Sequence, residues 1–197
     1  EAGLKVAAEQ LKKKVPTLLK ETDIFIYGTT RATNGIVERK IARTAFLTTE
    51  GFPDILLLKE GGKTEPHNLA MPYPEPYIPR SLTYEIPERI SAEGDVERTL
   101  DESLCKTLLE EMKENKIEAI AVCLLWSISN PTHELRLAEL IEEILPGTPY
   151  TLSHQINPIL REYRRASSTA IDASLKPLMQ SYLLNLQKDN DKEGHHL

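Results

Sequence analysis

An almost continuous apolar run from Ile117 to Leu125 constrains the fold more than any other feature of the sequence. A strand that is apolar at successive positions must be covered on both faces, which is typical of the middle of a parallel sheet. Helix signals lie on both sides of the run. Thr99 and Glu102 match a capping box before one helix, and Asn130 with Pro131 predicts the start of another. The segment therefore predicts helix, strand and helix in an α/β domain.

Other segments repeat this alternation of strands and helices. Short runs of apolar and branched residues predict further strands at residues 24–27, 44–48, 82–86 and 150–153. Apolar residues at helical spacing predict helices at residues 1–15, 32–39, 131–145 and 158–186, while residues 55–58 fit either state. Strands and helices that alternate with short connections predict a mostly parallel sheet covered by helices, with right-handed crossovers.

A proline-rich excursion interrupts this pattern at residues 66–96. It carries six of the 13 prolines between Pro66 and Pro87, too many missing N–H donors for a regular helix or a central strand. Residues 82–86 are expected to form an edge strand within it. We expect one domain over residues 1–187, followed by a polar tail at residues 188–197.

Composition excludes several classes of partner. The sequence has 24 Lys and Arg against 30 Asp and Glu, so no overall basic field attracts nucleic acid or an anionic membrane. It has neither a membrane-spanning apolar run nor a signal peptide, which predicts a cytoplasmic protein. Cys105 and Cys123 lie in apolar stretches and are expected to be core thiols. The five histidines are scattered, so no metal site is predicted.

The segment YGTTRATNG, residues 27–35, is the first candidate binding site. It lies where a predicted buried strand ends and a helix begins, the place where open α/β sheets bind ligands. Its small polar side chains suit phosphate or carboxylate oxygens. In the alternative interpretation, Thr30 merely caps the helix, and Thr33 and Asn34 are surface residues. The candidate ligands are Gly28, Thr29, Thr30, Thr33 and Asn34.

A second candidate is the arginine cluster formed by Arg161, Arg164 and Arg165. Three guanidinium groups in five positions can clamp an oxyanion, but they fit a solvated helix face equally well. No catalytic residue is predicted, because the sequence has no GxSxG nucleophile motif and Cys123 lies in the middle of a predicted strand. His133 and His154 are interpreted as surface or polar-core residues, and Trp126 as a core or interface anchor.

Several motifs in order resemble one protein family. YGTTRATNG is followed by IVERKIARTAFLTTEGFPDIL, PEPYIPR, EIPERISAEGDV, EAIAVCLLWSISNPTHELRLAELIEEILPG and LREYRRASSTAIDASLKPLMQSYL. Together these motifs resemble the N-terminal domain of the hydantoinase A/5-oxoprolinase family, which also includes large subunits of acetone and acetophenone carboxylases. The resemblance covers residues 22–183, with Tyr27 where the family usually has histidine.

The resemblance implies an actin-like, ribonuclease-H-like ATPase lobe that binds ATP and Mg²⁺ in a cleft between two lobes. It also implies a hydrolase that activates a cyclic amide, such as a lactam or hydantoin, for ring opening, with a second hydantoinase-type subunit or domain and an oligomeric assembly. The first candidate segment would contact phosphate or substrate. Weaker candidates for this contact are Arg161, Arg165, Ser168 and Thr169.

Two further roles stay open for this family. The chain could belong to an ATP-dependent ketone carboxylase of the acetone or acetophenone type, or it could be a non-catalytic assembly lobe whose proline-rich excursion docks a partner subunit. The family's opening phosphate-binding hairpin, roughly DxGGTxTD, is not found in the sequence. We therefore expect an incomplete lobe that is inactive by itself.

Overall fold

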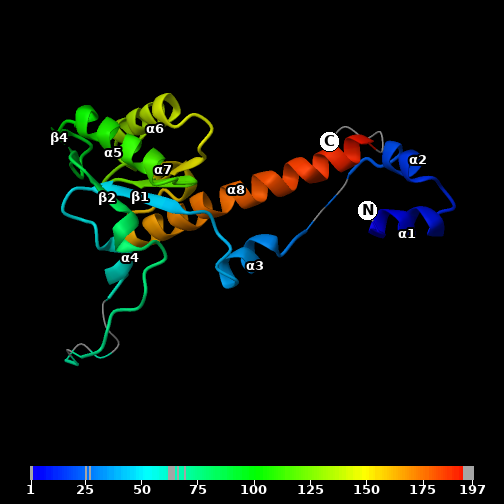
Figure 1. The fold of residues 1–197 in the computed structure, drawn as a ribbon, viewed down its shortest axis with the longest axis horizontal. Helices are drawn as coiled ribbons and strands as arrows, with labels where there is room; N and C mark the ends of the chain where they lie inside the picture. Colours follow the sequence, from blue (N-terminus) through cyan, green and yellow to red (C-terminus); the bar gives the residue numbers. More distant parts are fainter. Residues whose placement is uncertain are drawn as a thin grey trace. The chain divides into compact units, whose positions relative to one another are not determined.

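The chain forms two compact units in a computed structural model that describes residues 2–24, 26, 28–61, 65, 67–68 and 70–192. The sheet unit comprises Ile41–Pro177, and the helical unit comprises Glu1–Lys40 with Leu178–Leu197. Figure 1 labels most of the elements. The helices are α1 (Ala2–Gln10), α2 (Val15–Lys20), α3 (Arg31–Val37), α4 (Ile55–Leu58), α5 (Glu102–Glu114), α6 (Thr132–Ile144), α7 (Ser153–Ile156) and α8 (Glu162–Lys192), with a 3-10 turn at Arg80–Leu82.

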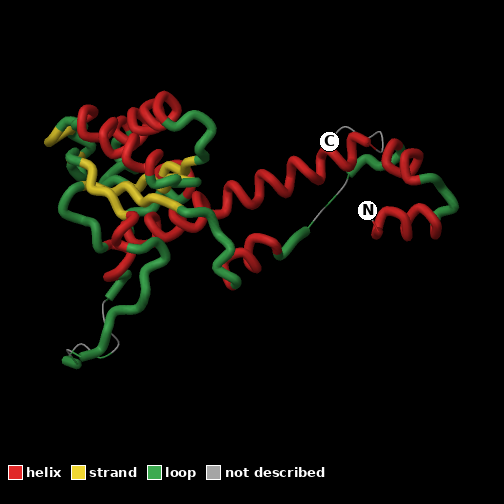
Figure 2. The backbone as a smooth tube through the Cα atoms, viewed as in Figure 1, coloured by secondary structure: helices red, strands yellow, loops and turns green. Residues whose placement is uncertain are grey.

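The sheet unit is built on four parallel strands, drawn in yellow in Figure 2. They are β1 (Thr44–Thr49), β2 (Thr83–Ile86), β5 (Ala119–Cys123) and β6 (Tyr150–Leu152), in the spatial order β2-β1-β5-β6. A separate antiparallel pair joins β3 (Arg89–Ile90) to β4 (Val96–Arg98). The predicted α/β fold with a mostly parallel sheet is confirmed, and β2 lies at an edge as expected.

Apolar side chains cover both faces of this sheet because neighbouring residues of a strand point to opposite faces. On one face, Leu47 and Val122 belong to a core cluster that includes buried residues of α5 and α6. On the other face, Phe46 and Ala121 pack in a cluster with alanines of α8. Ala121 of β5 lies opposite Phe46 of β1 in the parallel register. The central strand is therefore buried along its whole length, as its apolar run predicts.

The starts of α5 and α6 differ from the expected positions by one or two residues, and α8 begins at Glu162, later than the expected residue 158. Asp101, not Thr99, caps α5, and its carboxylate accepts a hydrogen bond of 3.0 Å from the Leu104 N–H. The capping-box interpretation is therefore wrong, because the chain turns into the helix two residues later. Asn130 Oδ1 accepts from the Thr132 N–H at 3.1 Å, so its side chain caps α6 from just outside the helix.

The helical unit departs from the sequence predictions. The expected helix over residues 1–15 ends at Gln10, and Pro16 belongs to the first turn of α2, where its missing N–H costs nothing. Ile24 and Ile26 are 76% and 89% exposed and form no strand, while the other two residues of the predicted strand 24–27 lie outside the described residues. An isolated extended segment has no backbone partners, so apolar content alone does not make it a strand.

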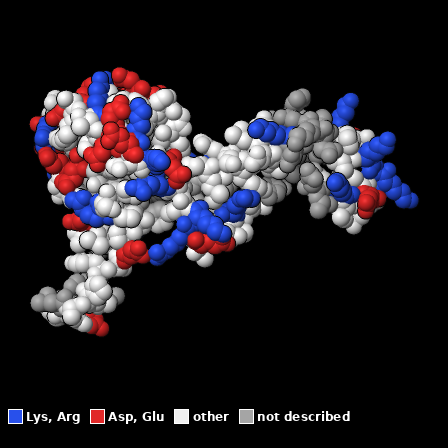
Figure 3. Space-filling model, in the orientation of Figure 1, with Lys and Arg blue, Asp and Glu red and all other residues white. Residues whose placement is uncertain are grey.

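The predicted polar tail at residues 188–197 overlaps the end of α8. The helix continues to Lys192, beyond the expected end near residue 186, and residues 193–197 lie outside the described part of the chain. None of the helices within the described residues is long and apolar enough to cross a membrane. On the face of the sheet unit seen in Figure 3, acidic and basic side chains are interspersed.

Cys105 on α5 and Cys123 on β5 are free and buried, which confirms the predicted core thiols. Burial raises the pKa of each thiol from its usual 9.0 to about 12. The folded protein therefore keeps both protons above pH 9, where the unfolded chain loses them. This raised pKa stabilises the fold fully below about pH 9, and the contribution is lost as the pH rises toward 12.

We expect both thiols to resist a thiol reagent at pH 8 until the protein is unfolded by denaturant, because reaction needs an exposed thiolate. The same assay with and without guanidinium chloride measures this. The free energy of unfolding should also decrease as the pH is raised above 9. Rapid labelling of the native protein would contradict the assignment of both residues to the core.

Candidate functional site

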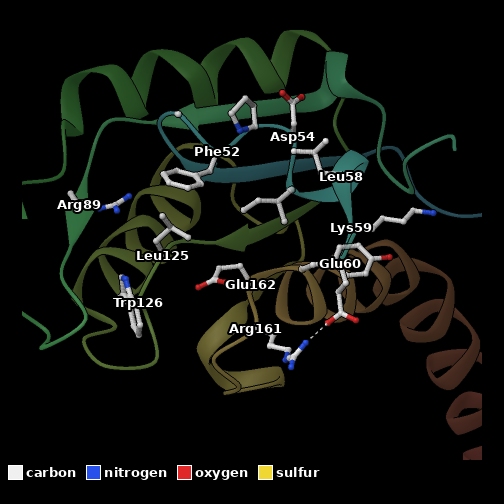
Figure 4. A pocket seen from close by; sticks show the side chains of 14 residues that line it. Phe52, Asp54, Leu58, Lys59, Glu60, Arg89, Leu125, Trp126, Arg161 and Glu162 are labelled. Atoms are coloured by element: carbon white, nitrogen blue, oxygen red, sulfur yellow. Dashed lines mark ion pairs between the residues drawn. The ribbon is translucent and has the colours of Figure 1, made fainter. Parts of the chain in front are cut away.

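The main cavity lies at the carboxyl edge of the parallel sheet. The chain proceeds outward from β1 to β2 on one side and from β5 to β6 on the other, so the strand order reverses between β1 and β5. Ligands of open parallel sheets bind outside the strand ends at such a switch point. The cavity there measures about 780 Å³, a size typical of small-molecule sites (Figure 4). Its lining comes from residues 51–55, 58–60, 89, 125–126 and 161–163.

Two acidic side chains at this cavity are already neutralised. Arg164 donates to both oxygens of Glu60 at 2.6 and 3.1 Å, and the Arg161 guanidinium lies 3.7 Å from the same carboxylate. The hydrogen bond from Arg164 lowers the pKa of Glu60 below its ordinary value. Asp54 lies 3.3 Å from the Arg80 guanidinium. These carboxylates therefore contribute little net charge to the cavity.

Other charged groups at the cavity are open. Within the described residues, the side chains of Glu162 and Lys59 have no hydrogen-bond or ion-pair partner. The Arg89 guanidinium stacks 5.2 Å from the Phe52 ring centre, and its nearest acid is Glu97, at 3.9 Å on the exposed rim. Stacking on an aromatic face leaves the N–H edges of a guanidinium free to bind a planar anion.

A tight turn after β5 supplies the apolar wall of the cavity. Trp126 has φ +55°, a left-handed conformation that costs a non-glycine residue about 1–2 kcal/mol. Its carbonyl accepts from the Ser129 and Asn130 N–H groups, and the Leu125 N–H donates to Thr49 Oγ1 at 3.0 Å. These hydrogen bonds hold the turn in its strained shape. Trp126 thus lines a pocket instead of anchoring the core.

Glu134, at the start of α6, holds the beginning of this turn by hydrogen bonds. Its side chain is fully buried, and Oε1 accepts from the Leu124 N–H at 2.9 Å and from the Ser153 hydroxyl at 2.6 Å. Oε2 accepts from the His154 N–H at 3.2 Å and lies 2.6 Å from His154 Nδ1. One carboxylate therefore links the ends of β5 and β6.

A second buried carboxylate, Glu88, lies just after β2. Its Oε2 is 2.7 Å from Nδ1 of the buried His133, and its Oε1 accepts from the Thr49 hydroxyl. Thr49 also accepts from the Leu125 N–H. Hydrogen bonds therefore connect His133 of α6, Glu88 after β2 and Thr49 of β1 with the turn that lines the cavity. A polar network that is satisfied in this way specifies one arrangement of its backbone.

Arg165 completes the support of the turn. It is only 1% exposed, and it donates to the Leu124 carbonyl at 3.0 Å, the Ile159 carbonyl at 2.7 Å and Ser153 Oγ at 3.2 Å. All three acceptors belong to this chain. Arg165 therefore positions backbone at the edge of the cavity through three of its N–H donors.

The helical unit carries a smaller pocket of about 420 Å³. Thr29, Thr30 and Asn34 line it, together with Arg31, whose guanidinium lies 4.8 Å from the centre of the Tyr182 ring. Thr30 is the N-cap position of α3, but its side chain makes no capping hydrogen bond. The alternative of a capping threonine is therefore wrong, whereas Thr33 and Asn34 are exposed, as the alternative of surface residues expects.

The other sequence candidates have separate places. Gly28 and Thr33 are exposed beside the smaller pocket without lining it, and Arg161 lines the main cavity. Ser168 Oγ donates to the Arg164 carbonyl and accepts from Asn157 at 2.9 Å. Thr169 is buried and donates to the Arg165 carbonyl at 2.7 Å. Gly28 and Thr33 thus belong to the helical unit, and Arg161, Ser168 and Thr169 belong to the sheet unit.

Sequence reasoning missed the residues that build the main cavity. Phe52 and Arg89 follow β1 and β2, and Trp126 follows β5, so all three occupy strand-end positions where ligand contacts concentrate. Their position just after a strand is the sequence signal that could have identified these residues. Nothing local marks Glu88 and Glu134 as buried, because their partners lie 10 to 45 residues away.

The fold and the cavity at its switch point define an open α/β lobe with a mostly parallel sheet. The crystal structure of the ATP-dependent caprolactamase from Pseudomonas jessenii matches it with a TM-score of 0.89 and 29% identity, covering 100% of this chain and 29% of that one. A sequence model described as hydantoinase/oxoprolinase N-terminal region matches residues 1–145. The chain belongs to the hydantoinase/oxoprolinase family.

Two relatives show the range of this family. The caprolactamase subunit alpha of Pseudomonas jessenii is 31% identical over 183 residues, which are 92% of this chain and 26% of that protein. The acetophenone carboxylase gamma subunit of Aromatoleum aromaticum is 34% identical over 192 residues, 91% of this chain and 26% of that protein. The chain thus spans about a quarter of the length of these relatives.

Proposed function

We propose that the chain is part of an ATP-dependent hydrolase that opens a cyclic amide. The observation that carries the proposal is the match to the caprolactamase structure along the whole chain. Amide resonance makes a lactam carbonyl a poor electrophile, so ring opening needs activation. ATP would supply a phosphoryl group that turns the amide oxygen into a leaving group, and the resemblance implies Mg²⁺ with the nucleotide.

The smaller pocket is the proposed contact to phosphate or substrate. Hydroxyl groups of Thr29 and Thr30, the amide of Asn34 and the Arg31 guanidinium are all suitable donors to anionic oxygens, which fits the chemistry of phosphate. Gly28 and Thr33 flank these donors. In the sheet unit, Arg161 is the proposed further contact, whereas Arg165, Ser168 and Thr169 would act by positioning backbone.

We expect the double variant Thr30→Ala, Asn34→Ala to lower ATP turnover by the complete enzyme at least about tenfold, because each donor stabilises developing charge. Phosphate release with a cyclic amide measures the effect. Thr107→Ala is the matched control, since this threonine is exposed on α5 and donates only to the Ser103 carbonyl of its own helix. Unchanged turnover in the double variant, with the fold intact, would contradict the assignment.

The same assay separates the second candidate function. The likeness to the acetophenone carboxylase subunit favours a ketone carboxylase as the alternative. Phosphate release by the complete protein with its partner subunit should be stimulated by 5-oxoproline or N-methylhydantoin if the hydrolase proposal holds. Stimulation only by acetone or acetophenone with bicarbonate would assign the protein to the carboxylases.

An assembly lobe is the third candidate, since both relatives are named as subunits. The exposed prolines Pro72 and Pro74 could dock a partner, whereas the end of the excursion is part of the fold. Ile78 is buried there, and the Tyr77 hydroxyl lies 2.8 Å from Ser174 Oγ. Replacing Pro72 and Pro74 with alanine tests docking without disturbing these contacts. Lost association with retained phosphate release would support the assembly role.

A further inference from the structure

One end of the main cavity combines two opposite open charges with an apolar floor. In the view of Figure 4, the Arg89 guanidinium and the Glu162 carboxylate lie on opposite sides of Leu125, with the rings of Phe52 and Trp126 nearby. Arg89 comes from the start of β3 and Glu162 from the start of α8, so two separate elements bring these charges to one cavity. The local sequence does not predict that either charge lies at this cavity.

Of the charged side chains at this cavity, those of Glu162 and Lys59 have no partner within the described residues, and Arg89 makes only the 3.9 Å ion-pair contact with Glu97. Glu60 is held by Arg164, and Asp54 lies beside Arg80, so neither carboxylate needs a ligand. The Glu162 side chain has no ion-pair or hydrogen-bond partner in the described part of the chain. The cavity therefore offers one unpaired carboxylate beside a stacked guanidinium, an arrangement that suits a molecule with charges of both signs.

We propose that this end of the cavity binds a small zwitterion, namely an amino acid with a free ammonium and a free carboxylate. The carboxylate would pair with the Arg89 guanidinium, whose planar fork matches it. The ammonium would pair with Glu162. The aliphatic part would lie on Leu125 between the rings of Phe52 and Trp126, which exclude water from the two ion pairs.

The chemistry of ring opening connects this site with the proposed function. Hydrolysis of a cyclic amide breaks the bond between the carbonyl carbon and the nitrogen; the hydroxyl of water adds to the carbon and its proton to the nitrogen. The product is one molecule with an amine and a carboxyl group, which is a zwitterion near pH 7. This connection rests on the proposed function, whereas binding of the zwitterion does not. The site would retain or sense the ring-opened product.

Isothermal titration calorimetry of the complete protein without nucleotide tests the proposal. We expect γ-aminobutyrate to bind at least about tenfold more tightly than butyrate, which lacks the ammonium, or butylamine, which lacks the carboxylate. The neutral ring 2-pyrrolidinone should also bind more weakly. Glycine, β-alanine and ε-aminohexanoate vary the distance between the two charges and measure the span of the site.

Variants assign the binding to this cavity. Glu162→Gln and Arg89→Gln should each weaken γ-aminobutyrate binding at least about tenfold. Glu143→Gln, an exposed carboxylate on α6, should leave binding unchanged. Glu162 begins a long helix and could serve only the helix dipole, in which case Glu162→Gln would change stability but not affinity.

The proposal is wrong if none of the zwitterions binds, if butyrate or 2-pyrrolidinone binds as tightly, or if the Glu162 and Arg89 variants keep their affinity. Failure of the hydrolase proposal has a different signature, namely phosphate release that no cyclic amide stimulates. The two outcomes are measured in separate experiments, one without ATP and one with it.

Discussion

Replacing Arg165 with methionine is expected to lower the free energy of unfolding by about 3 kcal/mol, because hydrogen bonds from a charged group contribute about 1.5–3 kcal/mol each. Methionine fills a similar volume but donates no hydrogen bond. The buried Leu124 carbonyl, 3.0 Å from the guanidinium, would stay buried without its charged donor, and the part-buried Ile159 carbonyl would lose a hydrogen bond of 2.7 Å. Guanidinium denaturation followed by circular dichroism measures the loss.

The neighbouring arginine supplies the control for this experiment. Arg164→Met removes an exposed guanidinium whose contacts are with Glu60 at the surface, so stability should not change measurably. Arg165→Lys keeps the charge but loses the planar fork, and its stability should lie between those of the wild type and Arg165→Met. Equal destabilisation by the two methionine variants would contradict the structural role of Arg165.

Glu134→Gln is expected to lower the free energy of unfolding by about 2–3 kcal/mol, although the side chain keeps its shape. Both carboxylate oxygens accept hydrogen bonds, from the Leu124 N–H and Ser153 hydroxyl on one side and the His154 N–H on the other. The amide nitrogen of glutamine would face a donor whichever way it is turned. The same denaturation assay measures the change.

Glu143→Gln on the same helix is the matched control, because its carboxylate is 62% exposed and reaches Lys106 only at 4.0 Å. The Glu134 variant should also move the turn that carries Trp126. Fluorescence of this residue, the one tryptophan of the sequence, should therefore change in the folded state. Normal stability and an unchanged spectrum would show that the carboxylate does not hold the turn.

These two variants explain why the cavity has a defined shape. The turn that lines it contains a residue with positive φ, and its amides and carbonyls are bound by Glu134, Arg165 and Thr49. A strained turn persists only where the surrounding structure over-determines it. The buried network thus connects the hydrophobic core with the cavity. Variants that break it should lower stability and also change the shape of the cavity.

The sequence by itself determined the local elements and the class of fold. The apolar runs at β1 and β5 and the helical periodicity of α5 and α6 depend on residues close together in the chain, so their pattern is readable without a structure. The alternation of these elements predicts a mostly parallel sheet. Ile24 and Ile26, from the apolar run predicted as a strand at residues 24–27, do not form a strand, because a strand also needs partners that the run itself does not contain.

Only the tertiary structure decided which polar residues became part of the site. Arg164 and Arg165 are adjacent and chemically identical, yet one is exposed and the other is 1% exposed. Successive residues of a helix point about 100° apart, so the packing of α8 against the sheet selects one guanidinium for the interior and leaves the other in solvent. His133 and Glu134 acquire their partners in the same way, from residues that follow the ends of β2, β5 and β6. Burial depends on how whole elements pack, and no local pattern carries that information.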